Sequence, residues 1–115
     1  RWDMFAKPKI AAAEIDGPGQ VKIGDIASFD VYVTFENKPY ASKEIKQVKY
    51  LLYNAANELV VIGEATPVED GYYVVKLTSE DIAALGAGAS KVEIAVIPIP
   101  GSQTTFTSVE FVIVK

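Results

Sequence analysis

The chain has 115 residues, half of them hydrophobic, and a net charge of −4 from 11 basic and 15 acidic side chains. This composition predicts one folded domain with its own core and excludes an intrinsically disordered chain. Cysteine and histidine are absent, which excludes disulfides, thiolate sites and imidazole catalysis. Because the basic residues are scattered over an acidic chain, we expect no nucleic-acid interface.

Apolar and polar residues alternate repeatedly along the chain. A strand directs successive side chains to opposite faces, so this alternation predicts strands with one buried face. Eight extended segments are expected in chain order, at 9–16, 21–23, 26–35, 45–53, 58–63, 72–77, 90–97 and 105–114. Gly-Pro-Gly at 17–19 ends the first segment, Pro39 ends the third, and the Pro-Ile-Pro-Gly stretch at 98–101 excludes regular structure between the last two.

One segment departs from the strand pattern. Thr78 is expected to cap a short helical turn near residues 79–85, because Glu80 and Asp81 follow it at the positive end of the turn. Ile82 and Leu85 are three residues apart on one face of this turn. Gly86 is expected to end it.

Short strands at near-regular spacing, without a long helix, predict an all-β fold. We expect an Ig-like β-sandwich of about seven antiparallel strands in two sheets over residues 9–115. Residues 1–8, which include Trp2, are assigned to an N-terminal tail or interdomain linker. Ile82 and Leu85 should close one end of a core formed by Ala13, Ile15, Phe29, Val31, Val33, Phe35, Val48, Tyr50, Leu52, Tyr73, Val75, Leu77, Val92, Ile94, Val96, Val109, Phe111 and Ile113.

The turn before Tyr72 resembles the D-x-G-x-Y-x-C pattern of immunoglobulin domains. Glu69, Gly71, Tyr73 and Val75 occupy its positions, with Glu in place of the Asp and Val in place of the bridging Cys. Two expected strands follow the strand that this turn opens, whereas one strand follows the corresponding strand of an immunoglobulin domain. The alternative is therefore that residues 70–73 open the fifth strand of the sandwich.

A second resemblance covers about residues 9–114. The stretch Val21-Lys22-Ile23-Gly24-Asp25, an alternating strand and then Asn37-Lys38-Pro39-Tyr40 resemble secreted Ig-like modules of the fibronectin, macroglobulin and invasin kind. With Asp70-Gly71-Tyr72-Tyr73 and Ala87-Gly88-Ala89-Ser90 added, the order is similar to the C-terminal Ig-like domain of archaeal extracellular solute-binding proteins of ABC transporters. The resemblance implies a membrane-proximal, non-catalytic domain whose solute site lies in other domains.

Carboxylates and tyrosines are the remaining candidates for a site. The adjacent acids Glu69-Asp70 and Glu80-Asp81 fall in a turn and a helix cap, where they are expected to face water rather than perform acid–base catalysis. Glu69, Asp70 and Asp81 could bind calcium only if their loops met at one end of the sandwich. We therefore expect no enzyme, no metal site and no cofactor.

Two tyrosine pairs raise the possibility of sugar binding. Tyr50 and Tyr53 lie on opposite faces of one expected strand, as do Tyr72 and Tyr73, so at least one ring of each pair should point outward or toward an edge. Coplanar exposed rings would favour a carbohydrate platform, and ordinary amphipathic packing is the alternative.

The sequence thus predicts a non-catalytic, extracytoplasmic spacer or docking module of a larger cell-surface protein. The alternative is a carbohydrate-binding or adhesive module. Expected partners are the neighbouring domains of the parent protein, with a weak homodimer possible through a sheet edge. No segment approaches the roughly 18 apolar residues of a membrane span, so any membrane anchor would lie outside this chain.

Overall fold

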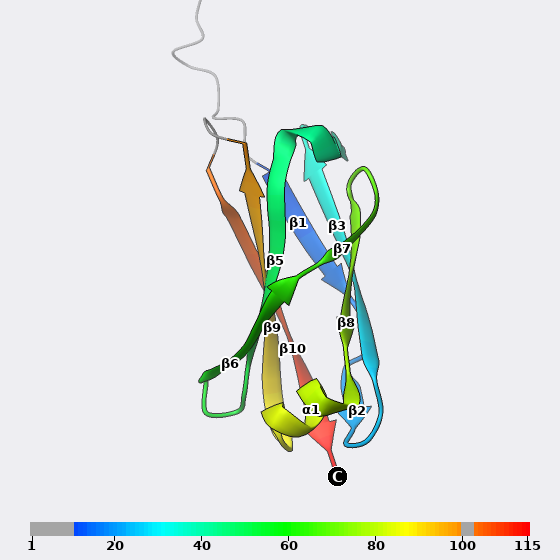
Figure 1. The fold of residues 1–115 in the computed structure, drawn as a ribbon, viewed down its shortest axis with the longest axis vertical. Helices are drawn as coiled ribbons and strands as arrows, with labels where there is room; N and C mark the ends of the chain where they lie inside the picture. The colour runs from blue at the N-terminus through cyan, green and yellow to red at the C-terminus, as the bar shows by residue number, and fades with distance from the viewer. Residues whose placement is uncertain (1–10, 100–102) are drawn as a thin grey trace, which may run out of the picture.

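The computed structural model describes residues 11–99 and 103–115, which form two facing β-sheets (Figure 1). One sheet contains β1 (Ala11–Asp16), β3 (Ala27–Phe35), β4 (Lys38–Pro39), β7 (Thr66–Glu69) and β8 (Tyr72–Leu77). The other contains β2 (Gln20–Lys22), β5 (Ile45–Tyr53), β6 (Leu59–Glu64), β9 (Gly88–Pro98) and β10 (Thr105–Val114). A 3-10 helix (Ser42–Glu44) precedes β5, and the helix α1 (Ser79–Leu85) lies between β8 and β9.

The strand order is that of an immunoglobulin-type sandwich. In the first sheet the order is β1-β3-β8-β7, with β4 also paired to β3, and in the second it is β2-β10-β9-β5-β6. These orders match the A-B-E-D and G-F-C sheets of Ig-like domains, with β6 added beside the C strand. Strand β8 therefore takes the fifth, or E, position between β3 and β7, and residues 70–73 open that strand.

The all-β sandwich is confirmed, with two differences in detail. The two sheets have five strands each in the described part of the chain, ten in all against about seven expected, because short pieces such as β4 and β7 also pair. One pairing is parallel rather than antiparallel. It joins β2 to β10, with Val21 opposite Ile113.

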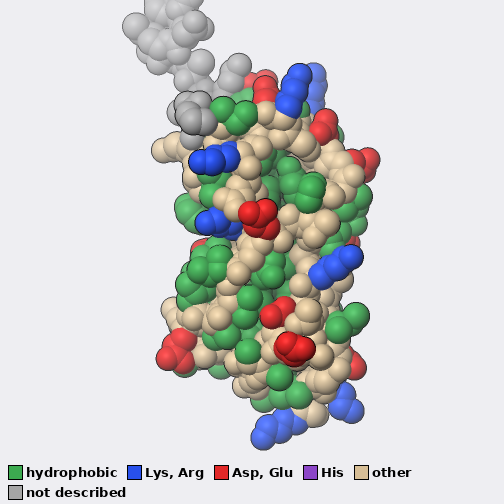
Figure 2. Space-filling view, in the orientation of Figure 1, with side chains coloured by type: hydrophobic (Ala, Val, Ile, Leu, Met, Phe, Trp, Pro, Cys, Tyr) green, Lys and Arg blue, Asp and Glu red, His purple; other side chains and the backbone are tan. Residues whose placement is uncertain are grey.

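The chain changes sheets on both sides of the sandwich. Residues 17–19 carry it from β1 in the first sheet to β2 in the second. On the other side, the extended chain passes from β6 to β7 at Ala65, whose N–H donates to the carbonyl oxygen of Val48 at 2.9 Å. This crossing runs diagonally across the front of the molecule, and hydrophobic side chains are visible along the seam that it crosses (Figures 1 and 2).

The expected inward side chains form the core. Phe29 and Phe111 are fully buried, with ring centroids 5.2 Å apart, and they join the two sheets. Most of the expected set is buried, and Ala13, Ile15, Phe35, Tyr50 and Val109 pack against the buried residues while remaining partly accessible. The core also contains Val21, Ala27, Tyr40 and Ala65, which the alternation did not indicate.

The helix α1 forms as expected. The Thr78 hydroxyl accepts a hydrogen bond from the N–H of Asp81 at 3.1 Å, and the Asp81 carboxylate accepts one from the N–H of Thr78 at 3.0 Å. This reciprocal capping box satisfies two N–H groups at the start of the helix. Ile82 and Leu85 are buried at the lower end of the sandwich, and Gly86 ends the helix.

Two prolines do not end strands as expected. Phe35 pairs with Lys38, so Glu36 and Asn37 form a two-residue hairpin turn with φ values of +55° and +66°, and Pro39 lies in β4. Strand β9 likewise continues through Pro98, which lies opposite Ile45. Lys9 and Ile10 of the first expected strand, the tail at 1–8, and residues 100–102 lie outside the described residues.

Candidate functional site on the outer face of the first sheet

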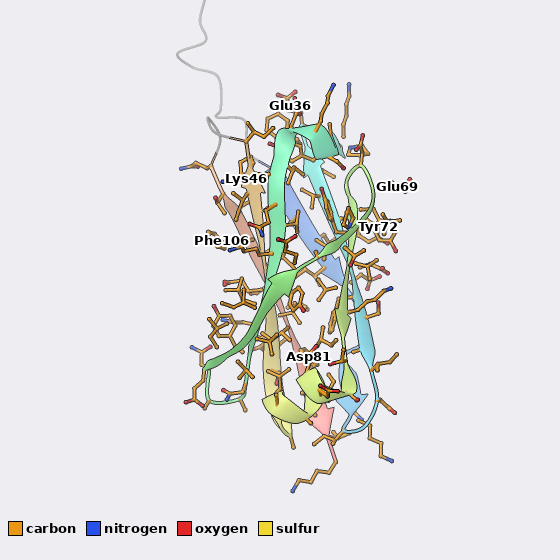
Figure 3. All side chains as sticks on the ribbon, viewed as in Figure 1. Glu36, Lys46, Glu69, Tyr72, Asp81 and Phe106 are labelled. Atoms are coloured by element: carbon orange, nitrogen blue, oxygen red, sulfur yellow. The ribbon has the colours of Figure 1, made fainter. Side chains whose placement is uncertain are left out.

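The acidic residues named from the sequence serve local structure and do not meet. Asp81 is used in the capping box of α1, in the lower half of the sandwich, whereas Glu69 lies near the opposite end (Figure 3). Asp70 accepts a hydrogen bond from the N–H of Ser42 at 2.9 Å, and this bond, helped by the charge of Lys43, lowers the pKa of the Asp70 carboxyl. Within the described residues, no three acidic, histidine or cysteine side chains are placed to hold a metal ion.

Tyr73 and Tyr50 are core residues. Tyr73 is buried on the inner face of β8. The Tyr50 ring lies across Gly63 on β6, where a Cβ atom would come within 2.4 Å of the phenol oxygen. Burial, followed by the charge of Asp81, raises the pKa of Tyr50.

Tyr53 lies on the outer face of the second sheet with partners supplied by β9. Its hydroxyl donates to the Glu93 carboxylate at 3.2 Å, and the Nζ atom of Lys91 lies 4.5 Å from the ring centroid. Burial and the Glu93 carboxylate raise the pKa of Tyr53. This ring face is therefore covered by a cation from the same chain.

Tyr72 lies on the outer face of the first sheet and stacks on Tyr32, which the sequence analysis did not single out. The two residues are directly opposite each other on β8 and β3, with ring centroids 5.2 Å apart and planes 11° from parallel. The Tyr72 hydroxyl donates to the Asp30 carboxylate at 2.8 Å, and this bond is the main reason that the pKa of Tyr72 is raised. The signal in the sequence was Tyr32 itself, a large aromatic residue among the polar residues of the alternating run 28–35.

A shallow hollow of about 300 Å³ lies beside Tyr32, on the side of β1. Ala12 and Ala13 contribute to its lining together with Glu14 and Thr34. Glu14 is directly opposite Tyr32 in the β1–β3 pairing, so a carboxylate and an aromatic ring face the same space. The small side chain of Ala12 leaves the space open.

A second groove, of about 190 Å³, lies where β6 crosses to β7. Its apolar lining includes Val48, Pro67 and Tyr73. Gln47 donates a hydrogen bond from its side-chain amide to the Glu64 carboxylate at 2.6 Å, and both of these residues line the groove. This contact ties β5 to the end of β6 beside the crossing.

Two large apolar side chains are exposed on the outer face of the second sheet, with charged residues between them. Phe106 on β10 and Ile62 on β6 are 62% and 57% exposed on the outer face of the second sheet. The strand registers place two charged residues, Lys49 and Glu93, and two apolar residues, Ala95 and Leu51, between them. Exposed apolar side chains are common on protein surfaces and do not by themselves mark a binding site. Basic side chains are likewise dispersed over the face in Figure 2 rather than gathered into a stripe.

Comparison with known proteins connects this chain to solved structures only. No family model matches the sequence, and no curated protein matches it. The filamin domain of Lin-41 is 16% identical with a TM-score of 0.59, over 88% of this chain and 90% of that one. The CARDB domain of a Pyrococcus furiosus protein, solved in complex with di-metal ions, is 16% identical with a TM-score of 0.54, over 92% and 89% of the two chains.

A further match is to a bacterial ice-binding adhesin of 1.5 MDa, studied for its retention at the host cell surface. It is 14% identical with a TM-score of 0.54 and covers 95% of this chain but 33% of the adhesin chain, so this chain spans about a third of that structure. These likenesses establish the fold. The domain has the Ig-like β-sandwich architecture of these modules. In the described part of the chain, no helix is long and apolar enough to cross a bilayer.

Proposed function

We propose that this domain is a non-catalytic, extracytoplasmic module that acts as a spacer or docking domain in a larger cell-surface protein. The observation that carries the proposal is the placement of the two ends of the sandwich. Strand β1 begins near one end of the long axis of the sandwich and β10 finishes at the other (Figure 1). Domains joined through such ends extend in line, which suits a spacer.

The pairing of β2 with β10 supports a mechanical role. The two strands are parallel at Gln20–Lys22 and Val112–Val114, next to the end of β10. A pull on the two ends of the chain draws these strands in opposite directions along their length. The hydrogen bonds of the ladder are then loaded together rather than one after another, because the pull runs along the strands and the bonds cross between them.

Force spectroscopy tests this role. The domain pulled from its N- and C-terminal ends should resist more force than the Asn57→Cys variant pulled from residue 57 and the C-terminal end. The β5–β6 connection that contains Asn57 lies at the same end of the sandwich as the end of β10 (Figure 1), so this geometry peels strands apart. The chain has no native cysteine, so the attachment is unique. Equal or lower resistance in the end-to-end geometry would reject the mechanical role.

We propose, more narrowly, that the parent is an archaeal solute-binding protein of an ABC transporter. The support is the order of sequence motifs from Val21 to Ser90 and the sandwich fold itself. The coding sequence around this domain tests the assignment. A large α/β domain before it, and a Ser/Thr-rich stretch with a membrane span after it, are expected. A cytosolic catalytic domain on either side would overturn the assignment.

The tyrosine geometry does not favour the carbohydrate alternative. A flat sugar platform needs rings side by side in one plane, whereas Tyr32 and Tyr72 stack and cover part of each other's faces. Tyr53 is covered by Lys91 on its ring face. Saturable binding in a glycan array that is lost in Tyr72→Ala would restore that alternative.

A further inference from the structure

The outer face of the first sheet holds an aromatic ring with one side unoccupied. Tyr32 is 42% exposed and lies between Tyr72 on β8 and the hollow on the β1 side. Because the Tyr32 and Tyr72 rings are nearly parallel, the second face of Tyr32 is directed toward that hollow. The negative electrostatic potential above a tyrosine ring attracts cations to such a face.

Three carboxylates share the outer sheet face with this ring. Glu14 is opposite Tyr32, and Asp16 is opposite Asp30, which accepts the hydrogen bond of the Tyr72 hydroxyl. Within residues 11–99 and 103–115, the Glu14 side chain makes no hydrogen bond or ion pair. The basic residue on the same face of β8 is Lys76, which pairs with Ser28, two rows along the sheet from Tyr32 and Tyr72.

On the second sheet, a tyrosine ring with a carboxylate partner also has a cation from the same chain over its face. There Tyr53 has a carboxylate partner in Glu93 and a cation, Lys91, over its ring from the directly opposite position of β9. At Tyr32 the directly opposite position on β1 is Glu14, a carboxylate instead of a lysine. The ring and the carboxylates are present there, and no described side chain of the domain supplies the cation.

We propose that the hollow between Tyr32 and Glu14 binds a guanidinium group, the arginine side chain of a protein partner. A guanidinium can stack flat on the tyrosine ring and donate two hydrogen bonds to the Glu14 carboxylate. The hollow is shallow and lies on an open sheet face, so a free small cation would stay largely in water. An arginine presented by a protein gains the contacts of the surrounding surface as well. This proposal is independent of the spacer role, and either can fail alone.

The test is an NMR titration of the ¹⁵N-labelled domain with a hexa-arginine peptide and, in parallel, with a hexa-citrulline peptide. Citrulline has nearly the same shape as arginine without the charge. Hexa-arginine should shift the amide signals of residues 12–14 and 30–34 in a saturable way, and hexa-citrulline should not. Tyr32→Ala and Glu14→Gln should each weaken the binding roughly five- to tenfold.

A third variant tests the comparison with Tyr53. In Glu14→Lys, the chain itself places a cation opposite Tyr32, and binding should be lost while the fold is retained. Glu110→Gln, which removes the same charge on the other sheet, and Phe106→Ala, which removes an exposed ring there, should bind like the unmodified domain. The dispersed NMR spectrum of each variant verifies its folding.

Three results would overturn the proposal. Equal losses in Glu14→Gln and Glu110→Gln would show only diffuse attraction of a polycation to an acidic domain. Equal binding of the citrulline peptide would exclude the cation. Free arginine that binds at residues 12–14 and 30–34 as tightly as the peptide would make the ligand a small molecule rather than a protein side chain.

Discussion

Replacing Gly71 with alanine should destabilise the domain strongly. Gly71 is buried in the turn before β8 with a φ of +76°, and its carbonyl oxygen accepts a hydrogen bond from the N–H of Val33 at 2.9 Å. A Cβ atom on this residue would lie 2.9 Å from the carbonyl oxygen of Val33 and 2.9 Å from the Cα atom of Pro39. Both neighbours are backbone atoms of paired strands, so neither can rotate away as a flexible side chain could.

Two costs add in the Gly71→Ala variant. Holding an L-residue in a left-handed conformation costs about 1–2 kcal/mol. Forcing extra volume against fixed neighbours costs about 1–3 kcal/mol more. The free energy of unfolding should therefore fall by about 2–5 kcal/mol. Gly24 is the matched control, because it has a φ of +101° with no atom near its absent Cβ. Gly24→Ala should lose only the conformational part, about 1–2 kcal/mol.

Urea denaturation followed by circular dichroism measures both losses. The slope of the free energy against urea should stay unchanged, since both variants keep the same buried surface. If Gly71→Ala loses no more stability than Gly24→Ala, the close packing of the β8 turn against β3 and β4 is not what requires glycine, and the reasoning fails.

Other predictions concern the core, a buried hydroxyl and a surface carboxylate. Phe111→Ala should cost about 3–5 kcal/mol by the same urea assay, and Phe106→Ala less than about 0.5 kcal/mol; equal losses would mean that the face assignment of β10 is wrong. The buried hydroxyl of Ser90 has no hydrogen-bond partner among the described residues. Ser90→Ala should therefore range from neutral to about 2 kcal/mol more stable, and a clear loss would reveal a partner. The hydrogen bond from the N–H of Ser42 lowers the pKa of Asp70 in the folded domain. The ionised Asp70 carboxylate therefore stabilises the fold above the unfolded pKa of about 3.9, and this stabilisation disappears as the pH falls through the lower folded pKa. Asp70→Asn should thus be less stable than the unmodified domain at pH 7 and equal to it in strong acid. A stability difference that persisted in acid would show that the ionised carboxylate is not its cause.

Local sequence predicted the long strands well where apolar residues alternate with polar ones. The expected segments 45–53, 72–77 and 105–114 coincide with β5, β8 and β10. The capping box of α1 was also predictable, because Thr78 and Asp81 are close in sequence and bond to each other. In these elements the side-chain pattern and the backbone hydrogen bonds favour the same conformation.

Strand β7 was missed because it has no pattern of its own. All of its residues, Thr66–Glu69, are exposed and one is a proline. It is a strand because it pairs with β8 after the chain crosses from the other sheet at Ala65. Similarly, Pro39 lies in a strand only because the turn at Glu36 and Asn37 folds it back onto β3.

The candidate site likewise combines features that local sequence predicted with contacts that depend on the pairing of distant strands. The sequence correctly placed Tyr72 and Tyr73 on opposite faces of one strand. It did not indicate the stacking of Tyr32 on Tyr72, because that contact depends on the register between β3 and β8. Glu69, Asp70 and Asp81, considered together for calcium, are separated because their turn and helix lie in different halves of the sandwich (Figure 3).

By itself, then, the sequence determined which stretches would become strands with one apolar face, where the helix would begin and most of the side chains that would form the core. These properties follow from residues two to four positions apart, whose periodicity decides which face is buried. Only the tertiary structure decided the order of strands, the crossings between the sheets and the parallel β2–β10 pair. It also decided that Glu14, Tyr32 and Tyr72, which come from three different strands, would lie side by side. Each of these features depends on the register between distant segments, and that register is selected by the packing of the whole core.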